Sequence, residues 1–192
     1  MTTSLALIVD DLCKSFRQRV SGKGFGGTIK AFIKPETRSV NAVNHLSFIV
    51  ERGERVAFVG PNGAGKSTTI KILSGILQPT SGKVSVLGFT PSKDRRQMAY
   101  RIGTVFGQRS QLWYHLPPED TFRLLACAYE IEADAYKKRL SFLTEAFDIA
   151  PLLDKPVRQM SLGQRMRCEI VASLLHKPDV LFLYEPTIGL DI

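Results

Sequence analysis

The motif that predicts the most specific chemistry is a glycine-rich loop that matches the pattern G-x-x-x-x-G-K-[ST]. The loop and the residue after it are Gly60, Pro61, Asn62, Gly63, Ala64, Gly65, Lys66, Ser67 and Thr68. Glycines let backbone N–H groups turn toward a phosphate, and the N-terminus of a following helix adds a partial positive charge. Lys66 is expected to neutralise β- and γ-phosphates, Ser67 to offer a hydroxyl to Mg²⁺, and Thr68 to hold an α-phosphate. The pattern predicts a binding site for a nucleoside triphosphate.

The segments on both sides of this loop have the patterns that such a site requires. Apolar residues at 56–59 predict a fully buried strand, which a turn at residues 51–54 joins to a strand at 46–50 as a β-hairpin. Apolar positions with helical spacing predict a helix over residues 66–76. The alternative is a glycine-rich turn that precedes a helix by chance, and the flanking strand and helix argue against it.

The remaining patterned segments alternate between strands and helices. Strands are predicted at residues 5–9, 83–87, 102–106 and 180–184, the second at a sheet edge and the last buried; helices are predicted from residue 118 to about residue 148, divided near residues 132–134, and from 161 to 175. This order predicts an α/β fold, a P-loop NTPase core with an antiparallel β subdomain and a helical subdomain.

The composition fits a single domain with an appended subdomain, because the chain has 192 residues, of which 44% are hydrophobic. The 26 Lys and Arg residues exceed the 18 Asp and Glu residues, for a net charge of +8, and seven of the basic residues lie among residues 13–40 with a single acidic one. Residues 17–40 are therefore expected to form an exposed, partly flexible extension of the strand subdomain, whose charge faces solvent, a partner or anionic lipid headgroups. A solvated loop without a partner is the alternative.

The cysteines and histidines give no sign of a metal site. Three cysteines, Cys13, Cys127 and Cys168, lack the spacing of zinc ligands, and their odd number argues against a disulfide framework, so a reducing compartment is expected. The histidines at positions 45, 115 and 176 are interpreted as structural. No signal peptide is expected, and no apolar run approaches the ~20 residues that a membrane-spanning helix needs.

A second motif, MSLGQ at residues 160–164, begins a predicted helix. Together with the loop above, Glu185 and the segments Pro186-Thr187 and Gly189-Leu190-Asp191, it resembles the nucleotide-binding subunit of an ABC transporter. The resemblance extends from residue 5 to the end of the chain. Within that family the chain is most similar to the stand-alone ATPase subunits of bacterial exporters, in several of which Ser-Leu-Gly-Gln replaces the commoner Ser-Gly-Gly-Gln.

The resemblance implies roles for residues of the second motif and for Glu185. Ser161, Gly163 and Gln164 would form the signature loop, which caps the γ-phosphate bound to the opposite subunit through a hydroxyl and backbone N–H groups at a helix N-terminus. An ordinary Ser N-cap beside a glycine is the alternative. Glu185 would be the general base for the attacking water.

The resemblance also implies roles for four less conspicuous residues. Gln108 would be the Gln-loop residue, whose amide contacts Mg²⁺ or water and couples to the membrane partner; the alternative is a polar loop residue, with Gln111 close by. Phe16 stands where the family has an aromatic ring that stacks on adenine, and a core phenylalanine is the alternative. Trp113 and Tyr114 follow the Gln loop, where a coupling helix of the membrane partner would dock; burial in the helical subdomain is the alternative.

The sequence departs from the family in two ways. Residues 180–185 resemble its second nucleotide motif, but Tyr184 stands where the family has an Asp that binds Mg²⁺ through water. The chain also ends at the D-loop, before the switch-region His of the family. It therefore looks like one ABC ATP-binding domain, residues 1–192, that is incomplete at its C-terminus. Its expected parts are a β subdomain with the P-loop core at 1–106, a helical subdomain at 107–170, and the Walker B strand with the D-loop at 171–192.

The function that the resemblance implies is an ATP-binding subunit that couples ATP binding and hydrolysis to export through a separate transmembrane permease. ATP and Mg²⁺ would be its cofactors, a homodimer its assembly, and the cytoplasmic face of the cell membrane its location. Because of Tyr184 and the early end, the ATPase activity is expected to be impaired, and an ATP-binding and dimerisation module without turnover is the alternative. A soluble factor acting on ribosomes or nucleic acid is a third hypothesis, motivated by the basic insert. The single cassette and Gln164 disfavour it, so no specific nucleic-acid partner is expected.

Overall fold

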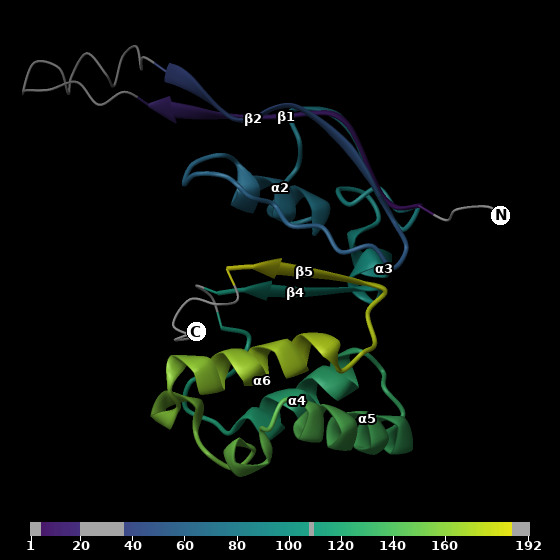
Figure 1. Ribbon diagram of the computed structural model, residues 1–192, viewed down its shortest axis with the longest axis vertical. Helices are drawn as coiled ribbons and strands as arrows, with labels where there is room; N and C mark the ends of the chain where they lie inside the picture. The colour runs from purple at the N-terminus through teal and green to yellow at the C-terminus, as the bar shows by residue number, and fades with distance from the viewer. Residues whose placement is uncertain (1–4, 20–36, 108–109, 186–192) are drawn as a thin grey trace, which may run out of the picture. The chain divides into compact units, whose positions relative to one another are not determined.

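Two long antiparallel strands, β1 (Leu5–Arg19) and β2 (Thr37–Glu51), are the centre of the first of two units into which the chain divides, residues 1–95. The strand β3 (Ser81–Val86) pairs antiparallel with the other edge of β1, so the strand order is β2-β1-β3 and β3 is an edge strand, as predicted (Figure 1). The structure, a computed structural model, describes residues 5–19, 37–107 and 110–185.

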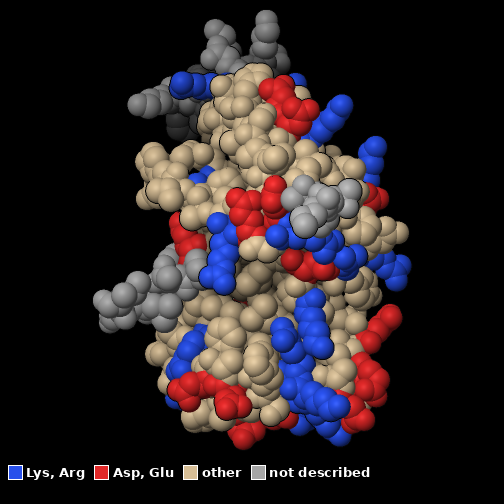
Figure 2. All heavy atoms as spheres, turned by 45° about the vertical axis from the view of Figure 1, so that its right-hand side comes forward, with Lys and Arg blue, Asp and Glu red and all other residues tan. Residues whose placement is uncertain are grey.

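The pairing of β1 with β2 continues into the basic insert, because the register runs from Phe16 opposite Val40 to Arg19 opposite Thr37. Both ends of the segment 17–40 therefore extend the sheet, as predicted, and residues 20–36 lie outside the described residues. On the face that Figure 2 shows, Lys and Arg side chains lie among Asp and Glu side chains. This mixture agrees with the small net charge of the chain outside the insert.

The segment 56–59, for which the sequence predicts a fully buried strand, has no regular secondary structure. Val56 is 50% exposed and Val59 is 92% exposed, so the prediction is wrong about both pairing and burial. The turn before it is present, because the Glu54 amide donates to the Glu51 carbonyl over 3.3 Å. A buried strand needs hydrogen-bonded neighbours, and no strand of the described residues pairs with this segment.

The helix that follows the glycine-rich loop is α2 (Lys66–Leu73), which ends at Leu73 rather than at residue 76. Ser74 is its C-cap, and Gly75 follows with φ +74°, a left-handed conformation that favours glycine and stops the helix. Ile70, Ile72 and Leu73 are buried, and the helix contacts β2 and β3. The apolar face of α2 therefore anchors the end of the loop to the sheet.

The second unit, residues 96–192, combines a parallel pair of strands with helices. The strands are β4 (Ile102–Phe106) and β5 (Val180–Tyr184); the helices are α4 (Pro118–Ala128), α5 (Ala133–Ala146) and α6 (Leu162–Leu174), with the short elements α3 (Arg95–Ala99), η1 (Ala150–Leu152) and η2 (Val157–Gln159) (Figure 1). Both strands have the predicted bounds, and the predicted division between α4 and α5 is confirmed.

The burial predicted for β5 is only partly confirmed. Phe182 is buried, but Leu183 is 41% exposed and the other residues of the strand are half-buried. Within the described part of this unit β5 pairs only with β4, so it has the exposure of a strand with one neighbour rather than of a central strand.

The core of the second unit lies among α4, α5 and α6. Phe122, Leu143 and Val171, one from each helix, are buried there together with Cys168. Burial raises the pKa of the Cys168 thiol to about 12, so this cysteine packs as a core residue and is not a reactive one. With the antiparallel sheet of the first unit, this helical core confirms the predicted α/β fold.

His176 follows α6 and joins this helix to β4. Its ring stacks on Tyr129 with 4.0 Å between the ring centroids, and its Nε2 atom lies 3.0 Å from the carbonyl oxygen of Ile102. That contact requires a proton on Nε2, and the buried Nδ1 atom has no hydrogen-bond partner among the described residues. Burial lowers the pKa of His176, and the missing acceptor at Nδ1 gives a second proton no favourable place.

The free energy of unfolding is expected to fall as the pH is lowered below about 6.5. The unfolded His176 takes up a proton at its ordinary pKa, whereas the folded residue stays neutral to lower pH, so acid favours the unfolded chain. The His176→Gln variant keeps a donor for the Ile102 carbonyl but does not titrate, and it should lose this part of the pH dependence. Urea unfolding across this pH range measures the effect, with His115→Gln at an exposed position as the matched control. Equal pH slopes in the two variants would contradict the prediction.

Candidate functional site

The glycine-rich loop leads into α2, and Gly65 is the N-cap of the helix. Gly65 has φ +84°, and a Cβ atom there would lie 2.2 Å from the carbonyl oxygen of Ala42 in β2. Because the neighbouring atom belongs to backbone and cannot turn aside like a side chain, the position requires glycine. This close approach fixes the loop against the sheet.

The loop presents several hydrogen-bond donors at one place. Lys66 Nζ lies 2.6 Å from the carbonyl oxygen of Gly60 and 2.8 Å from that of Pro61, which holds the ammonium group against the loop. The amides of residues 65–68 have no acceptor among the described residues, and Thr69 makes the first helical hydrogen bond, to Gly65, over 2.8 Å. Unpaired amides at a helix N-terminus beside an ammonium group form an anion site that suits a phosphate.

Phe16 lies in the same unit, on β1 opposite Val40. Its side chain is 39% exposed, and the ammonium group of Lys14 lies 5.1 Å from the centre of its ring. A core position, the alternative for this residue, is therefore wrong. An exposed aromatic ring beside a cation can stack on a planar base.

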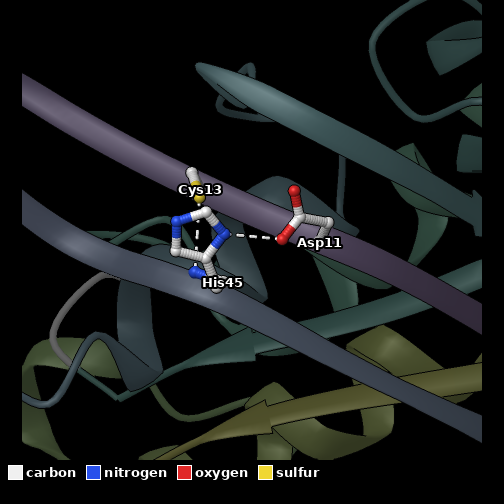
Figure 3. Close-up of side chains that lie close together, drawn as sticks. All are labelled: Asp11, Cys13 and His45. Carbon is white, nitrogen blue, oxygen red and sulfur yellow. Dashed lines mark hydrogen bonds and ion pairs between the residues drawn. The ribbon is translucent and has the colours of Figure 1, made fainter.

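Asp11, Cys13 and His45 form a cluster on β1 and β2 that the sequence did not predict (Figure 3). His45 Nδ1 lies 2.6 Å from Asp11 Oδ1, and the amide of His45 donates to Cys13 Sγ over 3.3 Å. The register of the two strands shifts between Val9 and Lys14, and Asp11 and His45 have left-handed φ angles of +50° and +49°. Zn²⁺ binds donors of these kinds. Each group already has a partner in the protein, so we assign the cluster to joining the strands at their irregular pairing.

The second motif begins α6 with a capping box. Ser161 Oγ accepts a hydrogen bond from the Gln164 amide over 3.2 Å, and Gln164 Oε1 accepts one from the Ser161 amide over 3.0 Å. The Ser N-cap considered as an alternative is therefore present. The signature role of Ser161, Gly163 and Gln164 toward a second subunit stays a prediction, and Ser161 is exposed, as that role would need.

The C-terminal ends of β4 and β5 lie side by side, with Phe106 opposite Tyr184. The Gly107 amide donates to the Tyr184 carbonyl over 3.0 Å, and a Cβ atom on Gly107 would lie 2.5 Å from the Glu185 carbonyl oxygen. Glu185 is half-buried and has φ +50°. Gln108 lies outside the described residues. The catalytic roles of Glu185 and Gln108 therefore stay predictions.

Gln111, the other glutamine of the loop after β4, has a structural partner. Its Nε2 atom donates to the carbonyl oxygen of Thr104 over 2.6 Å. Its amide donates to the carboxylate of Glu169 in α6, a residue that the sequence analysis missed. A signal for Glu169 was available, since the apolar residues Met166 and Ala172 stand three positions before and after it, a spacing that places it on the inner face of the helix.

Trp113 and Tyr114 are exposed, by 46% and 54% respectively, so their predicted alternative of burial is wrong. The guanidinium of Arg165 in α6 lies 5.7 Å from the ring centre of Tyr114. Leu116 is also exposed. Trp113, Tyr114 and Leu116 are thus three exposed apolar residues within four positions of the second unit. Among the described residues, no helix has the length and apolar character needed to cross a membrane.

Comparison with known families and proteins finds one consistent kind of relative. The ABC transporter family matches residues 43–188. The chain is 37% identical over 150 residues to the probable multidrug ABC transporter ATP-binding protein YbhF of Escherichia coli, covering 78% of this chain and 26% of YbhF. It is 32% identical to the ABC transporter ATP-binding protein NatA of Bacillus subtilis, over 80% of this chain and 62% of NatA. It is 38% identical to the daunorubicin resistance ATP-binding protein DrrA3 of Streptomyces coeruleorubidus, over 78% of this chain and 47% of DrrA3. The chain spans less than two thirds of each of these relatives.

Solved structures have the same fold. An ATP-binding subunit of an ABC transporter aligns with a TM-score of 0.76 and 29% identity over 97% of this chain and 68% of that one. CbiO1 from Clostridium perfringens, part of the ABC transporter complex cbiONQ, aligns with a TM-score of 0.73 and 27% identity over 98% and 68%. The predicted P-loop NTPase core is confirmed by these similarities.

Substitution of Gly65 by Ala is expected to damage the loop far more than the same change at Gly63. Both glycines have left-handed φ angles, but a Cβ atom on Gly63 would meet nothing within 4 Å. Gly63→Ala should therefore lower the free energy of unfolding by about 1 kcal/mol, the cost of the backbone conformation alone. Gly65→Ala adds the clash with Ala42 and should cost at least about 3 kcal/mol. Urea unfolding compares the two, and equal losses would show that β2 does not hold the loop.

Proposed function

Because this chain belongs to the ABC transporter family, we propose that it is an ATP-binding subunit that drives export through a separate transmembrane permease. The observation that carries the proposal is the loop at residues 60–68, whose unpaired amides and Lys66 ammonium form an anion site at the N-terminus of α2. A triphosphate brings the negative charge and the acceptor oxygens that these donors lack. The names of relatives, for multidrug transport and daunorubicin resistance, support export as the direction.

ATP would be bound by the first unit through its phosphates and its base. The amides of residues 65–68 would donate to phosphate oxygens, and Lys66 would exchange the carbonyls of Gly60 and Pro61 for the β- and γ-phosphates. Phe16 would stack on adenine, since its ring is exposed on the same unit. The loop is fixed in place by Gly65, so little conformational freedom would be lost on binding.

The loop also offers an oxygen ligand that fits Mg²⁺ beside the phosphates. Ser67 carries a hydroxyl oxygen in the first turn of α2, where it is half-buried, and Mg²⁺ prefers such hard oxygen ligands. Ser67 would hold the ion with phosphate oxygens of the nucleotide, and Gln108 is the other proposed ligand. When bound, Mg²⁺ neutralises charge on the phosphates. Tyr184 contributes a neutral phenol where the family has a carboxylate, so this part of the site is weakened.

Hydrolysis would depend on residues of the second unit. Glu185 is the proposed general base, which would accept a proton from the attacking water. Its backbone is held in a fixed direction at the end of β5, next to the strand end that leads to Gln108. Ser161, Gly163 and Gln164 would cap the γ-phosphate of a second subunit, so a homodimer is the proposed assembly.

The permease is proposed to bind at the segment that carries the exposed residues Trp113, Tyr114 and Leu116. A helix of a membrane protein that enters the cytoplasm could cover these apolar side chains and remove them from water. The subunit would then lie at the cytoplasmic face of the membrane.

The Lys66→Ala variant is expected to lose ATP affinity by about tenfold to a hundredfold, the value of a hydrogen bond to a charged group. Lys71→Ala is the matched control, because Lys71 is an exposed lysine in the last turn of the same helix. Equilibrium titration with a fluorescent ATP analogue, in the presence of Mg²⁺, measures both. If the two lysine variants lose affinity equally, the loop is not the phosphate site and the proposed function is wrong.

The unchanged chain is expected to bind ATP but to hydrolyse it at or near background, because Tyr184 supplies no carboxylate near the metal. The Tyr184→Asp variant should improve the Mg²⁺ dependence of phosphate release, by about tenfold or more in activity or in metal affinity. The Tyr184→Asn variant introduces a side chain with nearly the shape of the Asp side chain but without its charge, so the Mg²⁺ dependence should not improve. Rapid, Mg²⁺-dependent phosphate release by the unchanged chain, abolished by Lys66→Ala, would show that Tyr184 does not impair turnover.

A further inference from the structure

Glu169 is a carboxylate in the middle of α6 that is almost completely buried, with 4% of its surface exposed. Charged side chains are rarely buried to this degree unless they are paired or hydrogen-bonded. The residue belongs to neither of the two motifs, and the mechanism above gives it no part.

The Glu169 carboxylate binds three consecutive residues of the loop that follows β4. Ser110 Oγ donates to its Oε1 atom, and the Gln111 amide lies 2.9 Å from Oε1 and 3.0 Å from Oε2. The amide of Leu112 lies 3.4 Å from Oε1. Burial raises the pKa of Glu169, and these hydrogen bonds oppose the rise because they favour the ionised carboxylate.

The same loop is also held from the side of β4 and the core. Gln111 Nε2 donates to the Thr104 carbonyl over 2.6 Å, and the amide of Leu112 donates to Ser110 Oγ over 3.1 Å. The Leu112 side chain packs in the cluster that contains Phe122. Residues 110–112 therefore have a defined conformation that reaches from β4 to the carboxylate on α6.

Glu169 lies on the same helix as the turn at residues 161–164. A helix rises 1.5 Å per residue, so the eight steps along the chain from Ser161 to Glu169 span about 12 Å of a stiff element. A displacement of the N-terminal turn of α6 would therefore carry the carboxylate with it, and the loop through the hydrogen bonds.

We propose that Glu169 is a positioning residue that couples the loop at 110–112 to the N-terminal turn of α6, so that both respond together when nucleotide binds. The inference rests on the proposed function, since it concerns the response to ATP. The contacts call for a carboxylate, because its two oxygens accept all of these hydrogen bonds. A carboxamide has one acceptor oxygen and would turn its own N–H group toward the Gln111 amide.

Two variants separate coupling from stability. Glu169→Gln keeps the size of the side chain and removes the charge and one acceptor. Val171→Ala is the matched control, because Val171 is fully buried on the same helix and its truncation lowers stability by leaving a cavity. The contacts of Glu169 with residues 110–112 remain intact in that control.

Amide hydrogen exchange of the full chain, with and without ATP and Mg²⁺, is the experiment. In the unchanged chain, nucleotide should slow exchange both at residues 161–165 and at residues 110–112. In Glu169→Gln the amides of Gln111 and Leu112 should exchange about tenfold faster without nucleotide, and their response to ATP should be lost. The ATP affinity and the response at 161–165 should stay within about twofold of those of the unchanged chain, because the phosphate loop is unaltered. Val171→Ala should retain both responses.

Three results would overturn the inference in distinguishable ways. If exchange at Gln111 and Leu112 is the same in Glu169→Gln and in the unchanged chain, the carboxylate does not hold the loop. If the loop of Glu169→Gln exchanges faster but still responds to ATP as Val171→Ala does, Glu169 is only structural. If the unchanged chain binds no ATP, the proposed function fails and the inference fails with it.

Discussion

Backbone N–H groups at the start of a helix need an acceptor, and this requirement determines the chemistry of both helices that carry a motif. The helix α6 meets it in part within the protein, because Ser161 Oγ accepts a hydrogen bond from the Gln164 amide and Gln164 Oε1 accepts one from the Ser161 amide. The helix α2 does not, because its N-cap is Gly65, which has no side chain to offer, and the amides of residues 65–68 remain unpaired. A phosphate would give the amides of α2 the kind of acceptor that Ser161 gives the Gln164 amide of α6. The two motifs thus differ in their N-cap residues: Ser161 has a side chain that accepts a hydrogen bond from its helix, and Gly65 has none.

The unpaired amides can serve a ligand only if the loop keeps its shape without it, and the sheet provides that support. The carbonyl of Ala42 in β2 occupies the space that a side chain on Gly65 would need, and buried residues of α2 hold the helix behind the loop. The ammonium group of Lys66 bonds two carbonyls of the loop, which keeps its charge beside the amides. The strand β1, which pairs with β2, also carries Phe16. One sheet therefore supports both the proposed phosphate contacts and the proposed base contact.

The sequence predicted elements well where the signal is local. The bounds of β4 and β5, the gap between α4 and α5 and the Ser161 N-cap depend on short apolar runs, caps and turn residues. The strand predicted at 56–59 failed because burial of a strand depends on neighbours that its own residues do not specify. Distant contacts were also missed: Glu169 lies 58 positions from Gln111, and His45 lies 34 from Asp11, where a register shift brings them together. No spacing rule covers such pairs.

At the end of β5, backbone contacts set the conformation of Glu185, whereas the side chain of residue 184 sets the charge offered at the proposed site. Glu185 leaves the strand with φ +50°, a conformation that costs a non-glycine residue free energy and that often marks functional positions. Gly107, which follows the neighbouring strand β4, permits it, since a Cβ atom there would lie 2.5 Å from the Glu185 carbonyl oxygen. The Tyr184 carbonyl bonds the Gly107 amide through backbone atoms alone. The backbone of Glu185 is thus held by its close contact with a glycine, next to a backbone hydrogen bond of Tyr184. In the proposed site, tyrosine at position 184 would offer no negative charge to a metal, while the backbone turn that would place the proposed general base is present.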